Sequence, residues 1–180
     1  MTKITLIRHG QTNLNLYDII QGSTNAPLNE TGLRQASELG ERLKDISYDI
    51  CYVSPLIRTK ETALKALSGK CSFVLDDRIV ERNFGDVEGY SNELLDNKVI
   101  WDRDLNTSMH NIETINNVFE RCKLFLDDII NKNKDKSIAV VCHYTPFKVM
   151  HYLLRLIGKP WLGASASRTF LGIMILKIVK

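Results

Sequence analysis

The sequence lacks any apolar run close to the eighteen or so residues that a membrane-spanning helix requires. Its first apolar stretch is only as long as one strand, and polar residues follow at once, so a secretory signal peptide is not indicated. No C-x-x-C pair is present, and the cysteines lie mostly within apolar runs, at Cys51, Cys71, Cys122 and Cys142. These absences predict a cytoplasmic protein that contacts no membrane and keeps its buried thiols reduced.

Long runs of like charge are also missing. The 24 basic and 21 acidic residues leave a formal charge of +3, and the lysines at positions 132, 134 and 136 alternate with Asn and Asp. Nucleic-acid binding is therefore not predicted, although a small positive excess suits an anionic substrate. His151 lies near Cys142 and His143 in the chain but at no spacing typical of zinc sites, so neither a metal nor a cofactor is predicted.

The 180 residues, 44% of them hydrophobic, are predicted to form one globular domain over residues 1–180. Strand-like apolar runs at 4–8, 48–53, 71–75, 137–142 and 169–179 alternate with helical patterns at 29–46, 54–67, 113–130 and 144–158. Ser54 is expected to cap the second of these helices, with Pro55 in its first turn. The alternation predicts an α/β fold, a three-layer α/β/α sandwich with a mostly parallel central sheet.

The first strand ends in Arg8-His9-Gly10, at the kind of sheet edge where open α/β folds bind ligands. These residue types indicate phosphate chemistry. A histidine ring can attack phosphorus, a guanidinium can hold its oxygens, and a glycine lets the backbone approach closely. His9 is the candidate nucleophile, although a triplet this short also arises by accident.

The whole stretch from Arg8 to Asn15 resembles the signature of the histidine phosphatase superfamily, Arg-His-Gly-(Glu or Gln)-Thr-x-x-Asn, a family that includes the cofactor-dependent phosphoglycerate mutases. Later stretches resemble further motifs of that family in the same order, at Gln21-Gly22, Ser54 to Ala63, Glu81 to Gly85 and His143. The resemblance implies a phosphoglycerate mutase-like fold in which His9, Arg58 and His143 follow neighbouring strands and lie together.

The resemblance also implies the roles of these residues. Neutral His9 would attack a phosphomonoester in line while cationic and imidazole groups stabilise the charge. Composition leaves Glu81 and Glu88 equally open as the acid that protonates the departing alcohol, and the family pattern places it at Glu81. The catalytic residues implied are Arg8, His9, Arg58, Glu81 and His143, and the expected substrate contacts are Asn15, Gln21, Gly22 and Tyr144.

Tyr144-Thr145 is the clearest departure from the family pattern, which usually has glycine after the second histidine. A backbone amide at this point often helps to hold phosphate, so a tyrosine here is expected to narrow the pocket or to alter substrate choice. The acid-phosphatase and phytase branch has an aspartate at this position as its proton donor. Its absence supports Glu81 as the acid.

Residues 90 to 112 are the least informative part of the sequence, and in the family this region covers the site and shapes the pocket. A helix is expected within residues 93–101, with Leu94, Leu95, Val99 and Trp101 turned inward. Lys98, Arg103 and His110 are candidate substrate contacts, although residues of these types mostly face solvent.

Three functions remain open on the sequence. Mutases of the family are generally longer, with prolines and an Arg-Arg pair after the glutamate motif, whereas the link from Gly89 to Glu113 is short and has neither. We therefore predict hydrolysis of a small phosphorylated metabolite through a phosphohistidine, with phosphoglycerate mutase as the alternative. A catalytically silent phospholigand-binding protein is the second alternative, and the presence of all five catalytic residues disfavours it.

Overall fold

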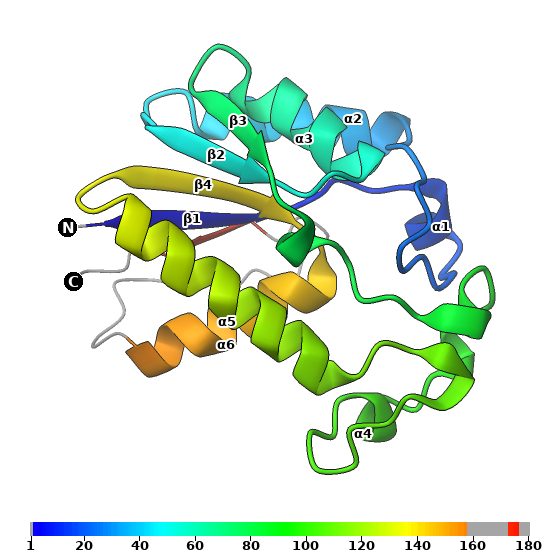
Figure 1. Cartoon of the computed structure of the whole chain (residues 1–180). Coiled ribbons are helices and arrows are strands. Elements are labelled where there is room, and N and C mark those ends of the chain that lie inside the picture. Colours follow the sequence, from blue (N-terminus) through cyan, green and yellow to red (C-terminus); the bar gives the residue numbers. More distant parts are fainter. Residues whose placement is uncertain (1, 158–172, 177–180) are drawn as a thin grey trace.

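The computed structural model describes residues 2–157 and 173–176, which form a five-stranded sheet flanked by helices (Figure 1). The strand order is β3-β2-β4-β1-β5. The strands are β1 (Lys3–Arg8), β2 (Ile50–Val53), β3 (Ser72–Leu75), β4 (Ser137–Cys142) and β5 (Ile173–Leu176). The last predicted strand, at 169–179, is described only at Ile173–Leu176, and its other residues lie outside the described part of the chain.

Four of these strands are parallel and β5 runs antiparallel to β1. The central strand β4 pairs with β1 on one side and with β2 on the other, in a register that sets Arg8 opposite Cys142. Its uninterrupted apolar run suits this position, because a central parallel strand is covered on both faces. The predicted mostly parallel sheet is therefore confirmed.

Helices cover both faces of the sheet, as predicted (Figure 1). The helices are α1 (Asn13–Leu16), α2 (Glu30–Arg42), α3 (Ile57–Leu67), α4 (Asn97–Ile100), α5 (Ile115–Lys132) and α6 (Tyr144–Ile157). One core lies beneath α2 and α3 and includes Leu39, Leu67 and Val141, while the other lies beneath α5 and α6 and includes Phe125, Val140 and Met150. The arrangement is a three-layer α/β/α sandwich.

The predicted start of α3 is wrong by two residues. The helix begins at Ile57 rather than after Ser54, and its N-cap residue, Leu56, is extended and makes no side-chain cap. The side-chain oxygen of Asn25 instead accepts a hydrogen bond from the backbone N–H of Ile57, over 2.7 Å. Because that cap comes from a distant loop, Ser54 is left for another contact.

The segment at 90–112 is less helical than predicted. It contains two 3-10 turns, η3 (Asn92–Leu94) and η4 (Met109–Asn111), and the single-turn helix α4. Leu94 is 62% exposed rather than turned inward, and Ile100 is the residue of α4 that is buried. With no long helix in this segment, a period of 3.6 residues does not describe which side chains are buried.

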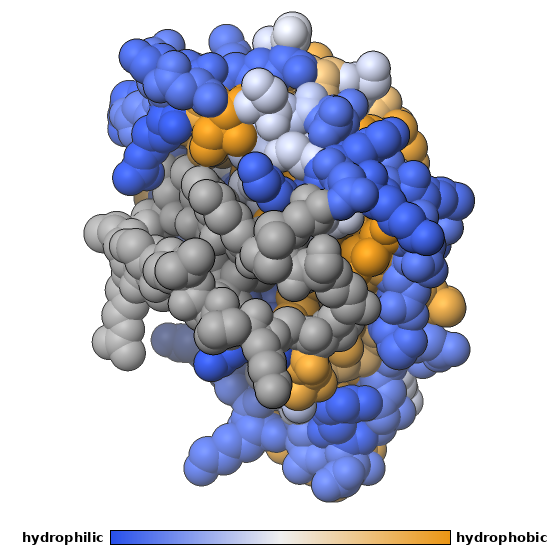
Figure 2. All heavy atoms as spheres, turned by 90° about the vertical axis from the view of Figure 1, so that its left-hand side faces the viewer, coloured by the Kyte–Doolittle hydropathy of each residue, from blue (hydrophilic) through white to orange (hydrophobic). Residues whose placement is uncertain are grey.

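The four parallel strands end toward α1 and the 90–112 segment, on the right of Figure 1, and begin at the opposite side. Figure 2 views the molecule from the side where the strands begin, and hydrophilic residues dominate the coloured surface around its rim. Within the described ranges, no helix combines the length and apolar character needed to cross a membrane. Because β1 and β2 both pair in parallel with β4, the carboxyl ends of these three strands meet at one edge of the sheet, and polar residues gather there.

Candidate active site

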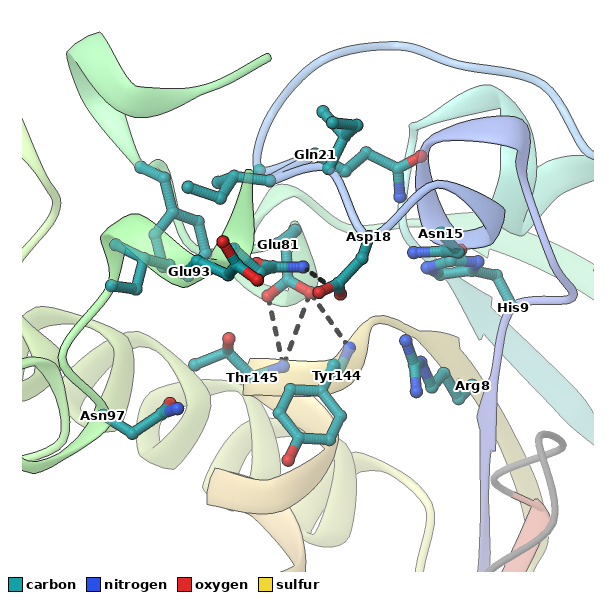
Figure 3. A pocket seen from close by; sticks show the side chains of 16 residues that line it. Arg8, His9, Asn15, Asp18, Gln21, Glu81, Glu93, Asn97, Tyr144 and Thr145 are labelled. Atoms are coloured by element: carbon teal, nitrogen blue, oxygen red, sulfur yellow. Dashed lines mark hydrogen bonds between the residues drawn. The ribbon is translucent and has the colours of Figure 1, made fainter. Parts of the chain in front are cut away.

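A cavity of about 590 Å³ opens at this edge of the sheet (Figure 3). Its wall combines the end of β1, the loop after α1, the Glu81 segment, the start of α6 and part of the 90–112 segment. The lining residues are Arg8, His9, Asn15, Asp18, Ile19, Ile20, Gln21, Gly22, Glu81, Phe84, Asn92, Glu93, Leu95, Asn97, Tyr144 and Thr145. The cavity thus contains seven of the nine site residues expected from the sequence.

His9 follows the last residue of β1 and has one defined tautomer. Its Nδ1 lies 2.7 Å from the carbonyl oxygen of Gly10, which can only accept, so Nδ1 carries the proton. Burial, and then the charges of Arg58 and Arg8, lower the pKa of His9 well below its ordinary value. The ring is therefore neutral near pH 7, and Nε2 carries the lone pair that a nucleophile needs.

Gly10 holds this part of the backbone against the start of α2. A Cβ on Gly10 would lie 2.6 Å from the carbonyl oxygen of Gly32, in the first turn of that helix. The backbone N–H of Gly10 also donates to Thr62 of α3. Only a glycine allows so close an approach, so Gly10 serves here to pack the His9 turn against α2 and α3.

Arg8 projects into the cavity beside Tyr144 (Figure 3). The carbon of its guanidinium lies 5.0 Å from the centre of the Tyr144 ring, on which it stacks. Arg8 Nε is buried and has no hydrogen-bond partner among the described residues. An anion in the cavity would satisfy this donor, and Tyr144 sets the direction in which the guanidinium points.

Gln21 and Asn15 present amides to the same cavity. The Thr12 hydroxyl lies 2.7 Å from Gln21 Oε1 and 3.1 Å from Asn15 Oδ1, and Thr12 also caps α1. Because the side-chain oxygens face Thr12, the amide nitrogens of Gln21 and Asn15 are the groups left to meet a ligand. Both are donors, as phosphate oxygens require.

Arg58 and His143 lie behind the cavity wall rather than in it. Both are fully buried, and Arg58 Nε donates to His143 Nδ1 over 3.1 Å. An acceptor at Nδ1 places the proton of the neutral ring on Nε2, which lies 2.7 Å from the Ser54 hydroxyl. Burial, then His9 and Arg58, lower the pKa of His143 well below its ordinary value.

The guanidinium of Arg58 is also tied to the loop that follows α1. It donates to the carbonyl oxygens of Gly22, over 2.8 Å, and Thr24, over 2.6 Å. Burial lowers the pKa of Arg58 to about 10, so the group is charged at neutral pH. Its contacts make Arg58 a link between this loop and His143, whose ring centre lies 5.1 Å from that of His9.

Glu88 holds the same loop in place. The sequence motif did not indicate this role. Its carboxylate accepts hydrogen bonds from the backbone and hydroxyl groups of Ser23 and Thr24 and from the backbone of Phe84. Gly22 has a φ of +48°, and a Cβ there would collide with Glu88. Glu88 therefore fixes the carbonyl groups that hold Arg58.

Glu81 lies at the amino-terminal end of α6. Its carboxylate accepts hydrogen bonds from the backbone N–H groups of Tyr144, over 3.0 Å, and Thr145, over 3.1 Å, shown as dashed lines in Figure 3. The helix dipole favours a negative charge there, and Glu81 is only 8% exposed. The backbone amide after His143 thus faces Glu81 in this structure.

A partly buried ion pair supports the backbone around Glu81. Arg121 of α5 pairs with Glu113 over 2.8 Å and donates to the carbonyl oxygens of Arg78, Val80 and Glu81. The two residues lie eight positions apart and their contacts cross from α5 to a loop, so no local sequence pattern marks them. This network holds the Glu81 backbone against α5.

The three candidate contacts in the 90–112 segment do not line the cavity, to which this segment instead contributes Asn92, Glu93, Leu95 and Asn97. Arg103 donates to Asn116 and stacks on Phe119, away from the site. Within the described residues, no group of three or more His, Cys, Asp or Glu side chains is arranged to hold a metal ion.

Comparisons with known proteins identify the family of the chain. The family model of the histidine phosphatase superfamily (branch 1) matches residues 4–164. The chain is 37% identical over 145 residues to an uncharacterized phosphatase, PhoE, of Bacillus subtilis, covering 79% of this chain and 72% of that protein. It is 30% identical over 161 residues to phosphoserine phosphatase 1 of Hydrogenobacter thermophilus, covering 86% and 76%.

A solved structure shows the same fold. The crystal structure of a phosphoserine phosphatase from Entamoeba histolytica, in complex with 3-phosphoglyceric acid, aligns with a TM-score of 0.73 and 31% identity. The alignment covers 87% of this chain and 81% of that one. The resemblance seen in the sequence motifs is therefore confirmed: the chain is a phosphatase that belongs to the histidine phosphatase superfamily (branch 1).

Proposed function

We propose that this protein hydrolyses phosphomonoesters of small metabolites through a phosphohistidine formed at His9. The observation that carries the proposal is the tautomer of His9, since the Nδ1–H bond to the Gly10 carbonyl leaves the lone pair on Nε2. Arg8 has a buried donor in the same cavity, suited to the phosphoryl oxygens. Relatives named phosphoserine phosphatase support a small phosphorylated substrate.

Each further residue has a defined part in this mechanism. Arg8 and the amides of Asn15 and Gln21 bind the phosphoryl oxygens in line with His9 Nε2. Glu81 transfers a proton to the departing alcohol oxygen, and then takes one from the water that hydrolyses the phosphohistidine. The P–O bond to the alcohol breaks as the P–N bond to His9 forms. Water then attacks the phosphorus, so that a new P–O bond forms and the P–N bond breaks, which gives free phosphate and neutral His9.

Residues behind the cavity wall complete the site. Arg58 acts through two contacts, holding His143 and the Gly22 carbonyl, and its charge adds to the positive potential around His9. Tyr144 orients Arg8 through their stacking.

We assign residues 1–180 to a single domain with the 90–112 segment as a wall of the pocket. A cytoplasmic location is supported by four free cysteines, three of them buried.

The test is trapping of the intermediate. Incubation with a labelled phosphomonoester, followed by rapid denaturation at alkaline pH, is expected to leave label on the peptide that contains His9, because phosphohistidine survives base. His9→Ala is expected to abolish both the label and phosphate release. His110→Asn, which removes an exposed histidine outside the cavity and suits its φ of 56°, is the matched control.

The same assay decides between hydrolysis and mutase activity. Phosphate release from several phosphomonoesters supports the proposal, whereas interconversion of phosphoglycerates without release would establish the mutase. Labelling with no turnover of any compound would fit neither. An unlabelled protein that binds phosphomonoesters without releasing phosphate would contradict the proposal and establish a silent phospholigand-binding protein.

A further inference from the structure

The cavity differs in charge between its two sides. His9 and Arg8 lie on one side of the view in Figure 3, while Glu93 and Asn97 lie on the other. Asp18, which is labelled between Glu93 and His9 in that view, also lines the cavity, together with its hydrogen-bond partner Asn92. The part of a substrate that extends away from the phosphoryl group therefore meets carboxylates and neutral amides.

Asp18 is held in place by the 90–112 segment. Its carbonyl oxygen accepts from the backbone N–H of Asn92 over 2.9 Å, and its Oδ1 accepts from Asn92 Nδ2 over 2.8 Å. A φ of 55° at Asp18 turns the chain here, and the neighbouring Ile19 forms a bridge with Ser91. These contacts fix one carboxylate in the wall, with Asn92 as the only partner that the described residues provide.

Glu93 supplies the second carboxylate. Its backbone N–H donates to the Ser91 hydroxyl over 3.3 Å at the start of η3, which orients the turn. Neither Glu93 nor Asp18 forms an ion pair with any lysine or arginine in the described part of the chain. Both carboxylates therefore keep the capacity to accept hydrogen bonds from a cationic ligand.

Among the described residues that line the cavity, no lysine or arginine other than Arg8 offsets these two groups. Arg8 is the one Lys or Arg among the described lining residues, and it stacks on Tyr144. Arg103 is engaged by Asn116 and Phe119. A carboxylate or second phosphate on the substrate would thus face like charges, an arrangement that disfavours binding.

Arg8 provides the independent observation that the same cavity takes an anion, since its buried Nε has no partner among the described residues. We propose that the alcohol part of the substrate carries an ammonium group and no second anionic group, so that the substrate is a phosphorylated amino alcohol. The inference rests on the proposed phosphatase function. Hydrolysis then releases phosphate and an alcohol whose ammonium group was held by Asp18 and Glu93.

The experiment compares kcat/KM for O-phosphoethanolamine, glycerol 3-phosphate, O-phosphoserine and 3-phosphoglycerate, with p-nitrophenyl phosphate as a general substrate. We expect phosphoethanolamine to be hydrolysed with the highest kcat/KM of the first four and 3-phosphoglycerate with the lowest. Phosphoserine, which adds a carboxylate to the same amine, is expected between them. Failure to hydrolyse even p-nitrophenyl phosphate would count against the phosphatase proposal itself, not against this specificity alone.

Two variants test the carboxylates directly. Glu93→Gln and Asp18→Asn remove one charge each and keep the shape, and asparagine tolerates the backbone conformation at position 18. Because both side chains are exposed, each variant is expected to lower the kcat/KM ratio of phosphoethanolamine to glycerol 3-phosphate by roughly threefold, mainly through KM. Glu41→Gln, an exposed change of equal charge on α2, is expected to leave the ratio unchanged.

The following results would overturn the proposal. A higher kcat/KM for phosphoserine or 3-phosphoglycerate than for phosphoethanolamine in the unmodified protein would overturn it. So would a ratio that stays constant in both Glu93→Gln and Asp18→Asn, or one that falls equally in Glu41→Gln. The last outcome would mean that net charge, rather than the cavity wall, selects the substrate.

Discussion

The carboxylate of Glu81 accepts a hydrogen bond from the backbone N–H of Tyr144, over 3.0 Å, at the first turn of α6. This contact joins the expected proton donor to the residue that follows His143. The carboxylate is thereby held in the lining of the cavity, where the proposed mechanism has it protonate the departing alcohol. Its position makes proton transfer, rather than phosphate binding, the step that should depend most on Glu81.

Glu81→Gln is expected to lower kcat for an alkyl phosphomonoester by about 10² to 10³, the usual range for loss of a general acid. p-Nitrophenolate departs without a proton, so the initial burst of p-nitrophenol from p-nitrophenyl phosphate should persist while steady-state turnover falls. Stopped-flow absorbance measures both phases. Glu120→Gln, an exposed change on α5, should alter neither. Loss of the burst would contradict this prediction, because it would show that phosphoryl transfer to His9 needs Glu81 even when the leaving group needs no proton.

The two buried histidines predict a pH dependence of stability. Burial lowers the pKa values of His9 and His143 in the folded protein, whereas an unfolded histidine takes up a proton near pH 6.5. Below about pH 6.5 the unfolded chain therefore binds more protons, and the free energy of unfolding falls as the pH falls. Above that pH both states are neutral and these groups contribute no pH dependence.

Urea unfolding at several pH values between about 5 and 8 measures this effect. In His143→Gln the glutamine can accept from Arg58 and donate to Ser54, so the contacts of the ring can be kept without its titration. The loss of stability between about pH 6.5 and 5 should be smaller in this variant than in the unmodified protein. An identical slope in both proteins would mean that carboxylates alone cause the acid destabilisation.

The sequence predicts the sheet and the strand ends well because the relevant signals are local. The apolar run of β4 and the change to polar residues at His143 place this histidine at a strand end without knowledge of the rest of the chain. Similar signals place His9 after β1, and parallel pairing then brings the two rings to 5.1 Å. Local patterns combined with parallel topology are thus sufficient to predict these features.

Contacts between distant segments account for what the sequence did not predict. Asn25 caps α3 from 32 positions away, so Ser54 is free to bond to His143 instead of capping the helix. Glu88 binds a loop 64 or 65 positions away, and its chemistry resembles that of any surface carboxylate until the loop is in place. Side chains whose partners are set by tertiary packing carry no local pattern from which these contacts could be inferred.

The Arg121–Glu113 pair is expected to stabilise the fold as well as the site. Arg121→Met keeps much of the side-chain volume but leaves the carbonyl oxygens of Arg78 and Val80 and the Glu113 carboxylate without this donor. The side chains are 17% and 19% exposed, so we expect a loss of about 2 kcal/mol in the free energy of unfolding. Urea titration measures it.

The exposed pair Lys123–Asp127 on α5 provides the control for this variant. Its side chains are 64% and 45% exposed, and Lys123→Met should change stability by less than about 0.5 kcal/mol. Equal losses in the two methionine variants would contradict a special role for Arg121. The kcat of Arg121→Met is measured at temperatures where the variant is fully folded. If Arg121→Met lowers kcat in the unmodified protein but not in Glu81→Gln, the network is linked to proton transfer.

Gly22 has a left-handed backbone conformation, lies against the Glu88 carboxylate, and accepts a hydrogen bond from Arg58. An alanine there would face a φ of +48° and a collision between its Cβ and Glu88, so the loop must move. Movement shifts the carbonyl oxygen that accepts from Arg58 Nη2, and with it the support of His143. Gly22→Ala is therefore expected to reduce kcat/KM by at least about tenfold, because small displacements of catalytic groups are costly.

Gly69→Ala separates this effect from backbone strain alone. Gly69 has a φ of +75°, but nothing lies within 4 Å of an added Cβ, and the residue is outside the cavity lining. We expect it to lose about 1 kcal/mol of stability through the left-handed conformation while kcat/KM stays unchanged. Steady-state kinetics and urea unfolding of both variants make the comparison. If Gly22→Ala loses stability to the same extent but keeps full kcat/KM, the link from Gly22 through Arg58 to the active site is not required for catalysis.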